Sequence, residues 1–215
     1  MKKVAVILAG SGVYDGSEIN EAVLTLLHIA KNGAAYQCFA PNIEQLHTIN
    51  HLTGNEMPEK RNVLIEASRI ARGDIKPVTE LNVAQFDALI VPGGFGAAKN
   101  LCDFALEGAQ ATINNDVLDA AKAFATAKKP AGYMCIAPAL VPFIYENAKL
   151  TIGNDEDTAQ ALQTLGATHI NCAVDDIVID ASNKLVTTPA YMLAQSIVEA
   201  DAGISKLVKT VLNLN

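Results

Sequence analysis

The sequence predicts an α/β fold with a mostly parallel sheet, helices on both faces and one antiparallel hairpin near the C-terminus. Two observations lead to this fold class. Short, continuous apolar runs alternate with segments in which apolar residues recur at spacings of three and four. Half of the 215 residues are hydrophobic, which is enough for a large core. Because chains of this length commonly form one domain of this class, we expect a single domain over residues 1–215.

The predicted strands are short and apolar. The first is the run from Val4 to Ala9, which no polar residue interrupts, as expected for a strand that is covered on both faces. Similar runs predict further strands at 36–40, 88–91 and 131–134. Near the C-terminus, 177–179 and 185–188 flank a turn-like sequence from Asp180 to Asn183, which predicts the hairpin.

The predicted helices follow from apolar stripes. The first begins after Ser17, a residue type that favours helix N-caps. Its apolar stripe consists of Ile19, Ala22, Val23, Leu26, Leu27 and Ala30. Comparable stripes predict helices within 63–71, 117–125, 159–165 and 190–211. Residues 42–58 match neither period and are interpreted as an inserted loop or a short extra element.

Charge and cysteine content exclude several classes of protein. Lys and Arg number 16 against 23 Asp and Glu, and the net charge of −7 argues against binding to nucleic acid or to an anionic membrane. No segment approaches the roughly 18 apolar residues that a membrane-spanning helix needs. The four cysteines are widely and irregularly spaced, which argues against a zinc site or a redox dithiol. Without a recognisable export signal, we expect reduced cysteines in a cytoplasmic protein.

The segment GYMCIAPAL, residues 132–140, is the first candidate for chemistry. A buried strand ends at Cys135, and Pro138 is typical of a helix start. This pattern predicts a nucleophile elbow, in which the following helix lowers the pKa of the thiol. Tyr133 is larger than such elbows favour, and Pro142 predicts that the helix is short or kinked. The alternative is a structural cysteine buried in the core.

Two further segments follow predicted strands, at the edge of the sheet where α/β proteins bind ligands. In VPGGFGAAKNL, residues 91–101, the glycines leave backbone N–H groups accessible, and those of Gly94 and Ile136 are our candidates for holding an oxyanion. An ordinary strand-to-helix turn is the alternative. In GVYDGSEIN, residues 12–20, Glu18 either complements the helix dipole or exchanges protons with Cys135.

In this order, the three segments resemble the PfpI-like superfamily, also called class I glutamine amidotransferase-like. Within it, the sequence resembles most the ElbB family of isoprenoid-biosynthesis glyoxalases. The similar stretches are GVYDGSEI, INHLTG, RNVLIEA, DALIVPGGFGAAKNL, MCIAPA, LTIG, VDDIV and TTPAYMLAQ. The resemblance implies a flavodoxin-like three-layer sandwich, a nucleophile at Cys135, a partner acid at Glu18 and a homodimer. It also implies a glyoxalase-type reaction that needs no metal, glutathione or other cofactor.

The sequence departs from relatives that pair the cysteine with a histidine. These carry the histidine soon after the nucleophile or in the later loop before the hairpin. Here residue 136 is isoleucine, and in THINCAVDD His169 comes early while Cys172 lies nearer the expected position. His51, His169 and Cys172 therefore remain candidates for the pocket, with structural roles as the alternative. Without a histidine base, an amidotransferase or protease is disfavoured.

The resemblance thus implies, and the residues fit, an enzyme that converts glyoxal or methylglyoxal to a 2-hydroxy acid through a hemithioacetal on Cys135. Its partner is a small aldehyde or dicarbonyl substrate. The alternative is a non-catalytic protein that uses the same cysteine for redox sensing or partner binding. A reactive cysteine serves both hypotheses, so only product formation at catalytic stoichiometry separates them.

Overall fold

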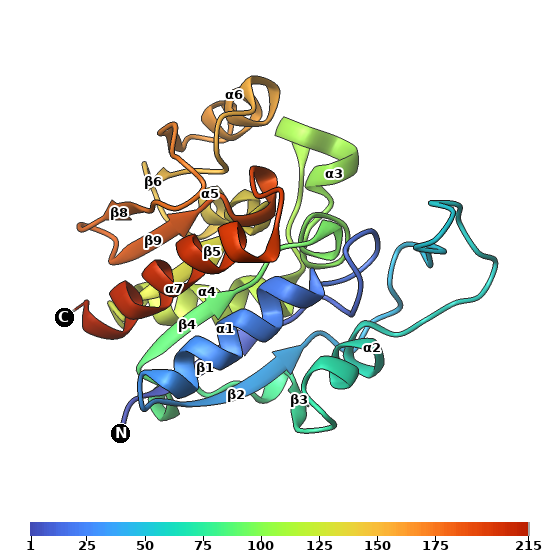
Figure 1. Ribbon diagram of the computed structural model, residues 1–215, viewed down its shortest axis with the longest axis horizontal. Helices are drawn as coiled ribbons and strands as arrows, with labels where there is room; N and C mark the ends of the chain where they lie inside the picture. Colours follow the sequence, from blue (N-terminus) through green and yellow to red (C-terminus); the bar gives the residue numbers. More distant parts are fainter. Residues whose placement is uncertain (215) are drawn as a thin grey trace.

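A seven-stranded sheet forms the centre of the computed structural model, which describes residues 1–214 (Figure 1). The strands run in the order β3-β2-β1-β4-β5-β9-β8, and all neighbours pair in parallel except β8 and β9. Their bounds are β1 (Lys3–Ile7), β2 (Ala35–Ala40), β3 (Ile75–Pro77), β4 (Ala88–Val91), β5 (Ala131–Met134), β8 (Val178–Asp180) and β9 (Leu185–Thr188). The predicted flavodoxin-like sheet with a C-terminal antiparallel hairpin is confirmed.

Helices cover both faces because successive side chains of each strand point to opposite sides. On β1, Ala5 and Ile7 belong to one core cluster, whereas Val4 and Val6 belong to the other. The first cluster is closed by α4 (Asn115–Thr126) and α5 (Val141–Ile144). The second is closed by α1 (Ile19–Lys31), α2 (Val63–Ile70) and α7 (Ile197–Asn213), of which α1 and α7 lie side by side in Figure 1. Two helical layers therefore enclose the sheet.

The remaining elements are short. A second, two-stranded parallel sheet pairs β6 (Lys149–Leu150) with β7 (Thr168–His169). The other helices are α3 (Phe104–Glu107), α6 (Glu156–Thr164) and the π-helical turn η3 (Ala97–Leu101). Single 3₁₀ turns are η1 (Val78–Glu80), η2 (Val83–Gln85), η4 (Gly108–Gln110), η5 (Ala137–Leu140) and η6 (Ala190–Met192). The strands β3, β6 and β7 have only two or three residues, which is too short to show a period, and no hairpin turn marks them as it marks β8, so the sequence did not reveal them.

The structure corrects the prediction for α1. Its N-cap is Glu18 rather than Ser17, whose Oγ instead accepts a hydrogen bond from the Ala9 N–H at 2.8 Å. Half of the predicted apolar stripe is 41–47% exposed, namely Ile19, Val23 and Leu27. A polar line is buried instead, consisting of Glu21, Thr25 and His28. The reason is that α1 packs against α7 as well as the sheet, and His28 Nε2 pairs with Asp201 Oδ1 at 2.6 Å.

The last helix also begins later than predicted. Residues 190–192 form the 3₁₀ turn η6, in which Ala190 has φ +45°, and α7 starts only at Ile197, with Ser196 as its N-cap. Residues 42–62 form an irregular loop that projects from the right of Figure 1. No helix within residues 1–214 has both the length and the apolar character that crossing a membrane requires.

Candidate active site

The candidate site lies where the carboxyl ends of β1, β4 and β5 meet. β1 connects through α1 to β2 on one side of it, whereas β4 and β5 lie on its other side. Such a reversal of strand order opens a crevice at the carboxyl ends of the strands, and α/β proteins bind ligands there. Each of the three segments singled out in the sequence follows one of these strands, so the topology brings them together.

Cys135 occupies the predicted elbow directly after β5. Its backbone φ is +57°, a left-handed conformation that costs a non-glycine residue of order 1–3 kcal/mol. The bend is held by β9, since the Cys135 N–H donates to the Thr188 carbonyl at 3.0 Å. As Pro142 indicated, the helical segment that follows is short, with the 3₁₀ turn η5 leading into the single turn α5.

Glu21 is the acid that the structure places against Cys135. Its carboxyl group is fully buried and accepts hydrogen bonds from the N–H of Gly93 at 2.8 Å and of Tyr191 at 3.1 Å. Burial raises the pKa of Glu21 to about 7, and the negative charge of Glu18 adds to the rise. Hydrogen bonds from Tyr191, Gly93 and the Cys135 thiol oppose it. Glu21 therefore changes protonation near neutral pH.

Glu18, predicted to be the partner acid, has a different place. As N-cap of α1 it is half-buried, and its Oε2 accepts a hydrogen bond from the Glu21 N–H at 2.6 Å. The carboxyl group beside the Cys135 sulfur belongs to Glu21, one helical turn further along α1. The prediction missed it because it began the helix one residue early. The spacing of Glu21, Thr25 and His28 places them on one face of a helix, but only the packing of α1 against α7 buries that face.

The structure also corrects the predicted thiolate. Burial raises the pKa of the Cys135 thiol well above its usual value, and the adjacent charge of Glu21 raises it further. The backbone N–H groups of Gly94 and Ile136 lower it again, but only in part. The helix expected to stabilise a thiolate is reduced to a short 3₁₀ turn. Cys135 is accordingly a neutral thiol near pH 7, with Glu21 as the group placed to take its proton.

The two backbone amides predicted to form an oxyanion hole do converge on Cys135. Both the Gly94 and the Ile136 N–H groups act on the sulfur in the resting protein. Gly94 adopts φ +92°, and a Cβ on it would collide with the backbone of residues 16–18. Glycine is therefore required for the β4 loop to lie this close to the start of α1. The catalytic role of the Gly94 and Ile136 N–H groups stays a prediction.

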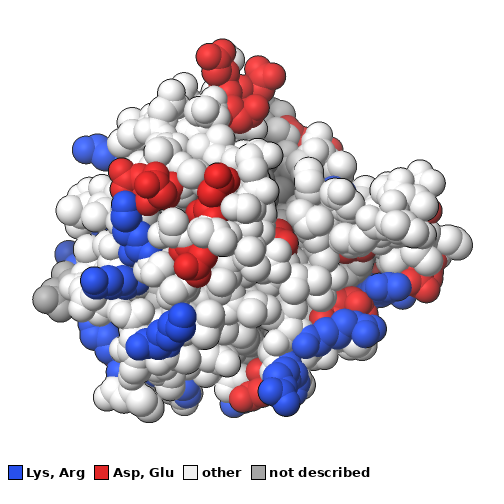
Figure 2. Space-filling view, viewed as in Figure 1, with Lys and Arg blue, Asp and Glu red and all other residues white. Residues whose placement is uncertain are grey.

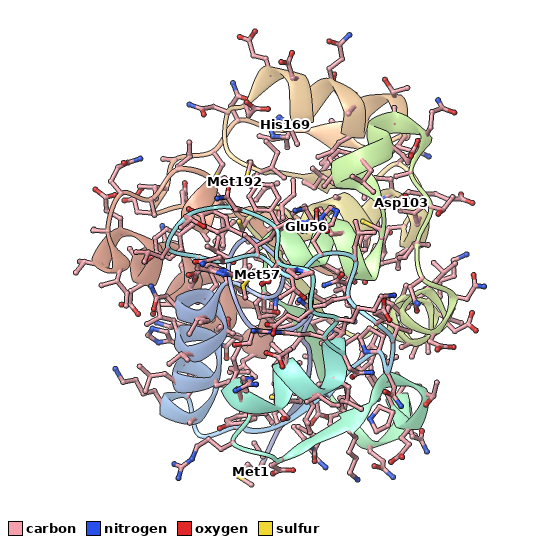
Figure 3. The ribbon with its side chains drawn as sticks, turned by 90° about the vertical axis from the view of Figure 1, so that its right-hand side faces the viewer. Met1, Glu56, Met57, Asp103, His169 and Met192 are labelled. Carbon is pink, nitrogen blue, oxygen red and sulfur yellow. The ribbon has the colours of Figure 1, made fainter. Side chains whose placement is uncertain are left out.

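Cys135 opens onto a cavity of about 510 Å³. Only 7% of the residue is exposed, so the sulfur is reached through this cavity. Its wall is mostly apolar, with Met192 of η6 (labelled in Figure 3) among the lining residues. Within residues 1–214 none of the four histidines lines it, and no cluster of His, Cys, Asp or Glu is suited to hold a metal ion.

His51 shapes a loop rather than lining the cavity. Its Nε2 accepts a hydrogen bond from the Tyr14 N–H at 3.2 Å, and its Nδ1 donates to the Ile49 carbonyl at 3.0 Å. The ring also packs against that of Tyr14, with 4.9 Å between centroids. Because both nitrogens are engaged, His51 fastens the 42–62 loop to the segment before α1. The sequence left a structural role open for His51, and the contacts of its ring support that role.

His169 and Cys172 also lie away from the cavity wall. His169, labelled in Figure 3, lies beside the small sheet. Its Nε2 accepts a hydrogen bond from the Ile152 N–H at 3.2 Å, and burial lowers the pKa of His169. Burial together with the charge of Asp176 raises the pKa of Cys172 to about 11. The structure joins neither residue to Cys135.

Gly93 offers a test of this geometry. A Cβ on residue 93 would overlap the Cys135 Cβ and lie 2.9 Å from Glu21 Oε2. We expect Gly93→Ala to push the two groups apart and to lower the free energy of unfolding by about 1–3 kcal/mol, as measured in urea. Gly54→Ala is the control for backbone strain, because φ is +75° there but nothing lies within 4 Å of the added carbon. It should lose stability without changing the rate at which iodoacetamide alkylates Cys135, and an unchanged rate in Gly93→Ala would contradict the tight packing around Gly93.

Comparison with known proteins places the chain in a family. No family model matches the sequence. Over 99% of its length, however, the chain is 43% identical to the ES1 protein homolog, mitochondrial, of Rattus norvegicus, and it covers 84% of that protein. The chain belongs to the ES1 family. Over 99% of its own length, this ES1-family protein is also 42% identical to the human glutamine amidotransferase-like class 1 domain-containing protein 3, mitochondrial, of which it covers 83%.

Solved structures agree with the fold of this ES1-family protein. An isoprenoid biosynthesis protein with an amidotransferase-like domain from Ehrlichia chaffeensis superposes with a TM-score of 0.93 at 36% identity, covering 100% of this chain and 99% of that one. Drosophila melanogaster DJ-1beta shares the fold alone, with a TM-score of 0.55 at 14% identity over 99% of this chain and 95% of that chain. The superfamily expected from the sequence is thereby confirmed.

The same relatives correct the prediction of a cytoplasmic protein. The rat and human proteins are both described as mitochondrial. So is the ES1 protein of Danio rerio, which is 32% identical over 88% of this chain and of which the chain covers 76%. Reduced cysteines and an acidic composition do not distinguish one reducing compartment from another, so the sequence argument could not support the choice.

Proposed function

We propose that this ES1-family protein converts small dicarbonyl compounds to 2-hydroxy acids by glyoxalase-type chemistry on Cys135. The observation that carries the proposal is the pairing of a cavity-facing thiol with a buried carboxyl group whose pKa is about 7. A proton acceptor that titrates near the working pH is suited to general acid–base catalysis. The pairing supplies a nucleophile and a proton carrier without a histidine.

The reaction begins with addition of the Cys135 sulfur to the aldehyde carbon. The C–S bond forms while Glu21 takes the thiol proton and delivers it to the carbonyl oxygen, which gives a hemithioacetal. The Gly94 and Ile136 N–H groups stabilise the negative charge that develops on this oxygen. Because the carboxylate accepts the proton during attack, the thiol needs no low pKa in the resting state.

Glu21 then carries protons for the isomerisation. It removes the hydrogen from the former aldehyde carbon and passes this proton to the neighbouring ketone oxygen, which gives an enediol. It then takes the proton from the hydroxyl group on the sulfur-bearing carbon and delivers it to the neighbouring carbon. The product of this step is a thioester of a 2-hydroxy acid on Cys135. Water hydrolyses the thioester, releasing the acid and restoring the thiol. The net change adds one water to the dicarbonyl and involves no external oxidant or reductant.

The same geometry argues against the other activities considered. Redox-sensing cysteines are accessible and low in pKa, whereas Cys135 is buried and its pKa is raised. Amide hydrolysis and amidotransfer need a base that also protonates a leaving amine, a role usually taken by histidine. Among the described residues, no histidine lines the cavity.

Product formation under defined conditions tests the proposal. The protein is incubated with methylglyoxal or glyoxal, with chelator and without glutathione, and lactate or glycolate is quantified over time. We expect many equivalents of product per protein chain. Cys172→Ser is a matched control that should keep full activity, because Cys172 does not line the cavity. Product that stops at one equivalent or less would contradict an enzymatic role.

We also propose, from the family resemblance, that the chain forms a homodimer. Sedimentation equilibrium measures the mass in solution directly. A mass of twice the 22.7 kDa chain is expected, and a mass equal to one chain at micromolar concentration would contradict it.

A further inference from the structure

The cavity beside Cys135 is larger than a small dicarbonyl needs. Its volume of about 510 Å³ falls in the range of roughly 300–1,000 Å³ that is typical of sites for drug-sized ligands. Phe95, Phe104 and Met192 contribute to its mostly apolar wall. Covering apolar surface contributes about 25 cal/mol per Å², and three-carbon methylglyoxal would use little of this wall. The space favours a carbonyl compound that carries an apolar substituent.

The charged side chains that line the cavity are both acidic. Among the described residues they are Asp155 and Asp157, both exposed at the start of α6. Hydrogen bonds from Thr158 lower the pKa of Asp155, so its carboxylate stays ionised at neutral pH. Within residues 1–214 neither aspartate forms a salt bridge. Figure 2 shows acidic side chains gathered at the top of the molecule, where α6 lies in Figure 1.

One basic residue, Lys99, approaches the ring of Phe95, which lines the cavity. The Lys99 ammonium group donates a hydrogen bond to the Tyr14 carbonyl at 3.2 Å and lies 5.2 Å from the centre of the Phe95 ring. Lys99 is not among the residues that line the cavity. Among the described residues that line the cavity, a substrate carboxylate would therefore meet two negative charges and no positive one.

We propose that this cavity admits uncharged or cationic carbonyl compounds with an apolar substituent and disfavours anionic ones such as 2-oxo acids. Asp155 and Asp157 are the residues that set this charge preference. The carbonyl chemistry rests on the proposed function. The preference for charge and size, however, belongs to the path that leads to Cys135, and it can be measured without any turnover.

Thiol modification of Cys135 measures the charge preference. Three methanethiosulfonate reagents of similar size are compared: one neutral, one with a cationic ammonium group and one with an anionic sulfonate. Each forms a disulfide with the Cys135 sulfur and releases methanesulfinate, and peptide mass spectrometry follows this cysteine alone. With two carboxylates near the path, we expect the cationic-to-anionic rate ratio at low salt to be about tenfold larger at Cys135 than with a free thiol in solution. The ratio should fall as salt is added.

Two variants assign the preference to the cavity wall. In the double variant Asp155→Asn/Asp157→Asn the helix cap is kept, because asparagine caps helices as well as aspartate does. We expect its cationic-to-anionic ratio to fall several-fold toward the ratio that the same reagents show with a free thiol in solution, and the charges of Glu18 and Glu21 near the sulfur to account for any remaining preference. Glu156→Gln removes one charge from the same turn at a residue that does not line the cavity, and it should change the ratio less than twofold. A wild-type preference that persists in the double variant would overturn the proposal.

A third variant tests size. Ala105 lines the cavity from α3 and is exposed, so Ala105→Trp fills space without disturbing the core. We expect a benzyl thiosulfonate to react at least several-fold more slowly with this variant, while the methyl reagent is unaffected. For turnover, phenylglyoxal should show a higher kcat/KM than glyoxylate in the wild type.

The turnover and thiol-modification experiments separate a failure of the proposed function from a failure of the proposed selectivity. No turnover of any carbonyl compound, combined with charge-selective modification, would refute the proposed function and leave the selectivity standing. Turnover that prefers glyoxylate, or modification without charge preference, would refute the selectivity.

Discussion

Replacing Cys135 by alanine is expected to abolish dicarbonyl turnover, with a loss of at least about 10³-fold in kcat. The reason is that the sulfur is the only nucleophile described at the elbow, and the hemithioacetal cannot form without it. The measurement is lactate released from methylglyoxal, followed over time with the protein at known concentration. Cys135→Ser is the companion variant, since its hydroxyl keeps the volume and the hydrogen-bonding capacity but is a far weaker nucleophile.

The fold should survive these changes. The left-handed backbone at residue 135 is held by the hydrogen bond to the Thr188 carbonyl, which the side chain does not make. We therefore expect a circular dichroism spectrum and a urea midpoint close to those of the wild type. Full activity in a folded Cys135→Ala protein would refute the proposed mechanism, because the chemistry would then have to occur elsewhere.

The second large effect is expected at Glu21. Glu21→Gln keeps the shape of the side chain but removes its capacity to take a proton, and general acid–base groups typically contribute about 10²–10⁴-fold. We expect a loss of this size in kcat/KM. The matched control is Glu18→Gln, the same change one turn earlier on α1. Glutamine can still cap the helix there, so we expect a loss of less than about tenfold.

The two glutamine variants also differ in their effect on the thiol. Because the charge of Glu21 raises the pKa of Cys135, its removal should make the thiol more acidic and speed its alkylation by iodoacetamide. A variant that is more reactive towards alkylation yet slower in turnover would identify Glu21 as a proton carrier. If turnover instead rose with thiol acidity, Glu21 would only be a source of charge.

The pH profile provides a further check on the same residue. The pKa of Glu21 lies at about 7, above its usual value of 4.5, so the carboxylate form that accepts protons increases as the pH rises through about 7. We expect kcat/KM of the wild type to rise through this window and then to level off. In Glu21→Gln the inflection should disappear. A profile without an inflection near 7 in the wild type would contradict this assignment.

Much of the fold follows from local pattern. The strands β1, β4 and β5 are continuous apolar runs, and the hairpin is marked by the turn after Asp180, whose carboxylate accepts hydrogen bonds from Ser182 and Asn183. The elbow at Cys135 is likewise visible as a buried strand that ends at a cysteine shortly before a proline. Periodicity carries this information because burial on one or both faces requires it.

The partner of Cys135 could not be derived in the same way. Glu18 and Glu21 both lie at the start of α1, and no local rule says which of them faces the sulfur. The answer depends on the exact start of the helix and on its packing against α7, which turns Glu21, Thr25 and His28 inward. The pKa of the thiol has the same origin, because burial and the distance to Glu21 exist only in the folded chain.

By itself, the sequence determined the α/β class, the order of the main strands along the chain, the elbow and the two amides beside it. Only the tertiary structure decided which carboxyl group meets the sulfur, that the thiol is neutral at rest, and that acidic side chains line the path to it. The physical reason is that hydrophobic periodicity and turn chemistry act over a few neighbouring residues. Proton affinity and electrostatic selectivity arise instead from groups that are distant in sequence and brought together by folding.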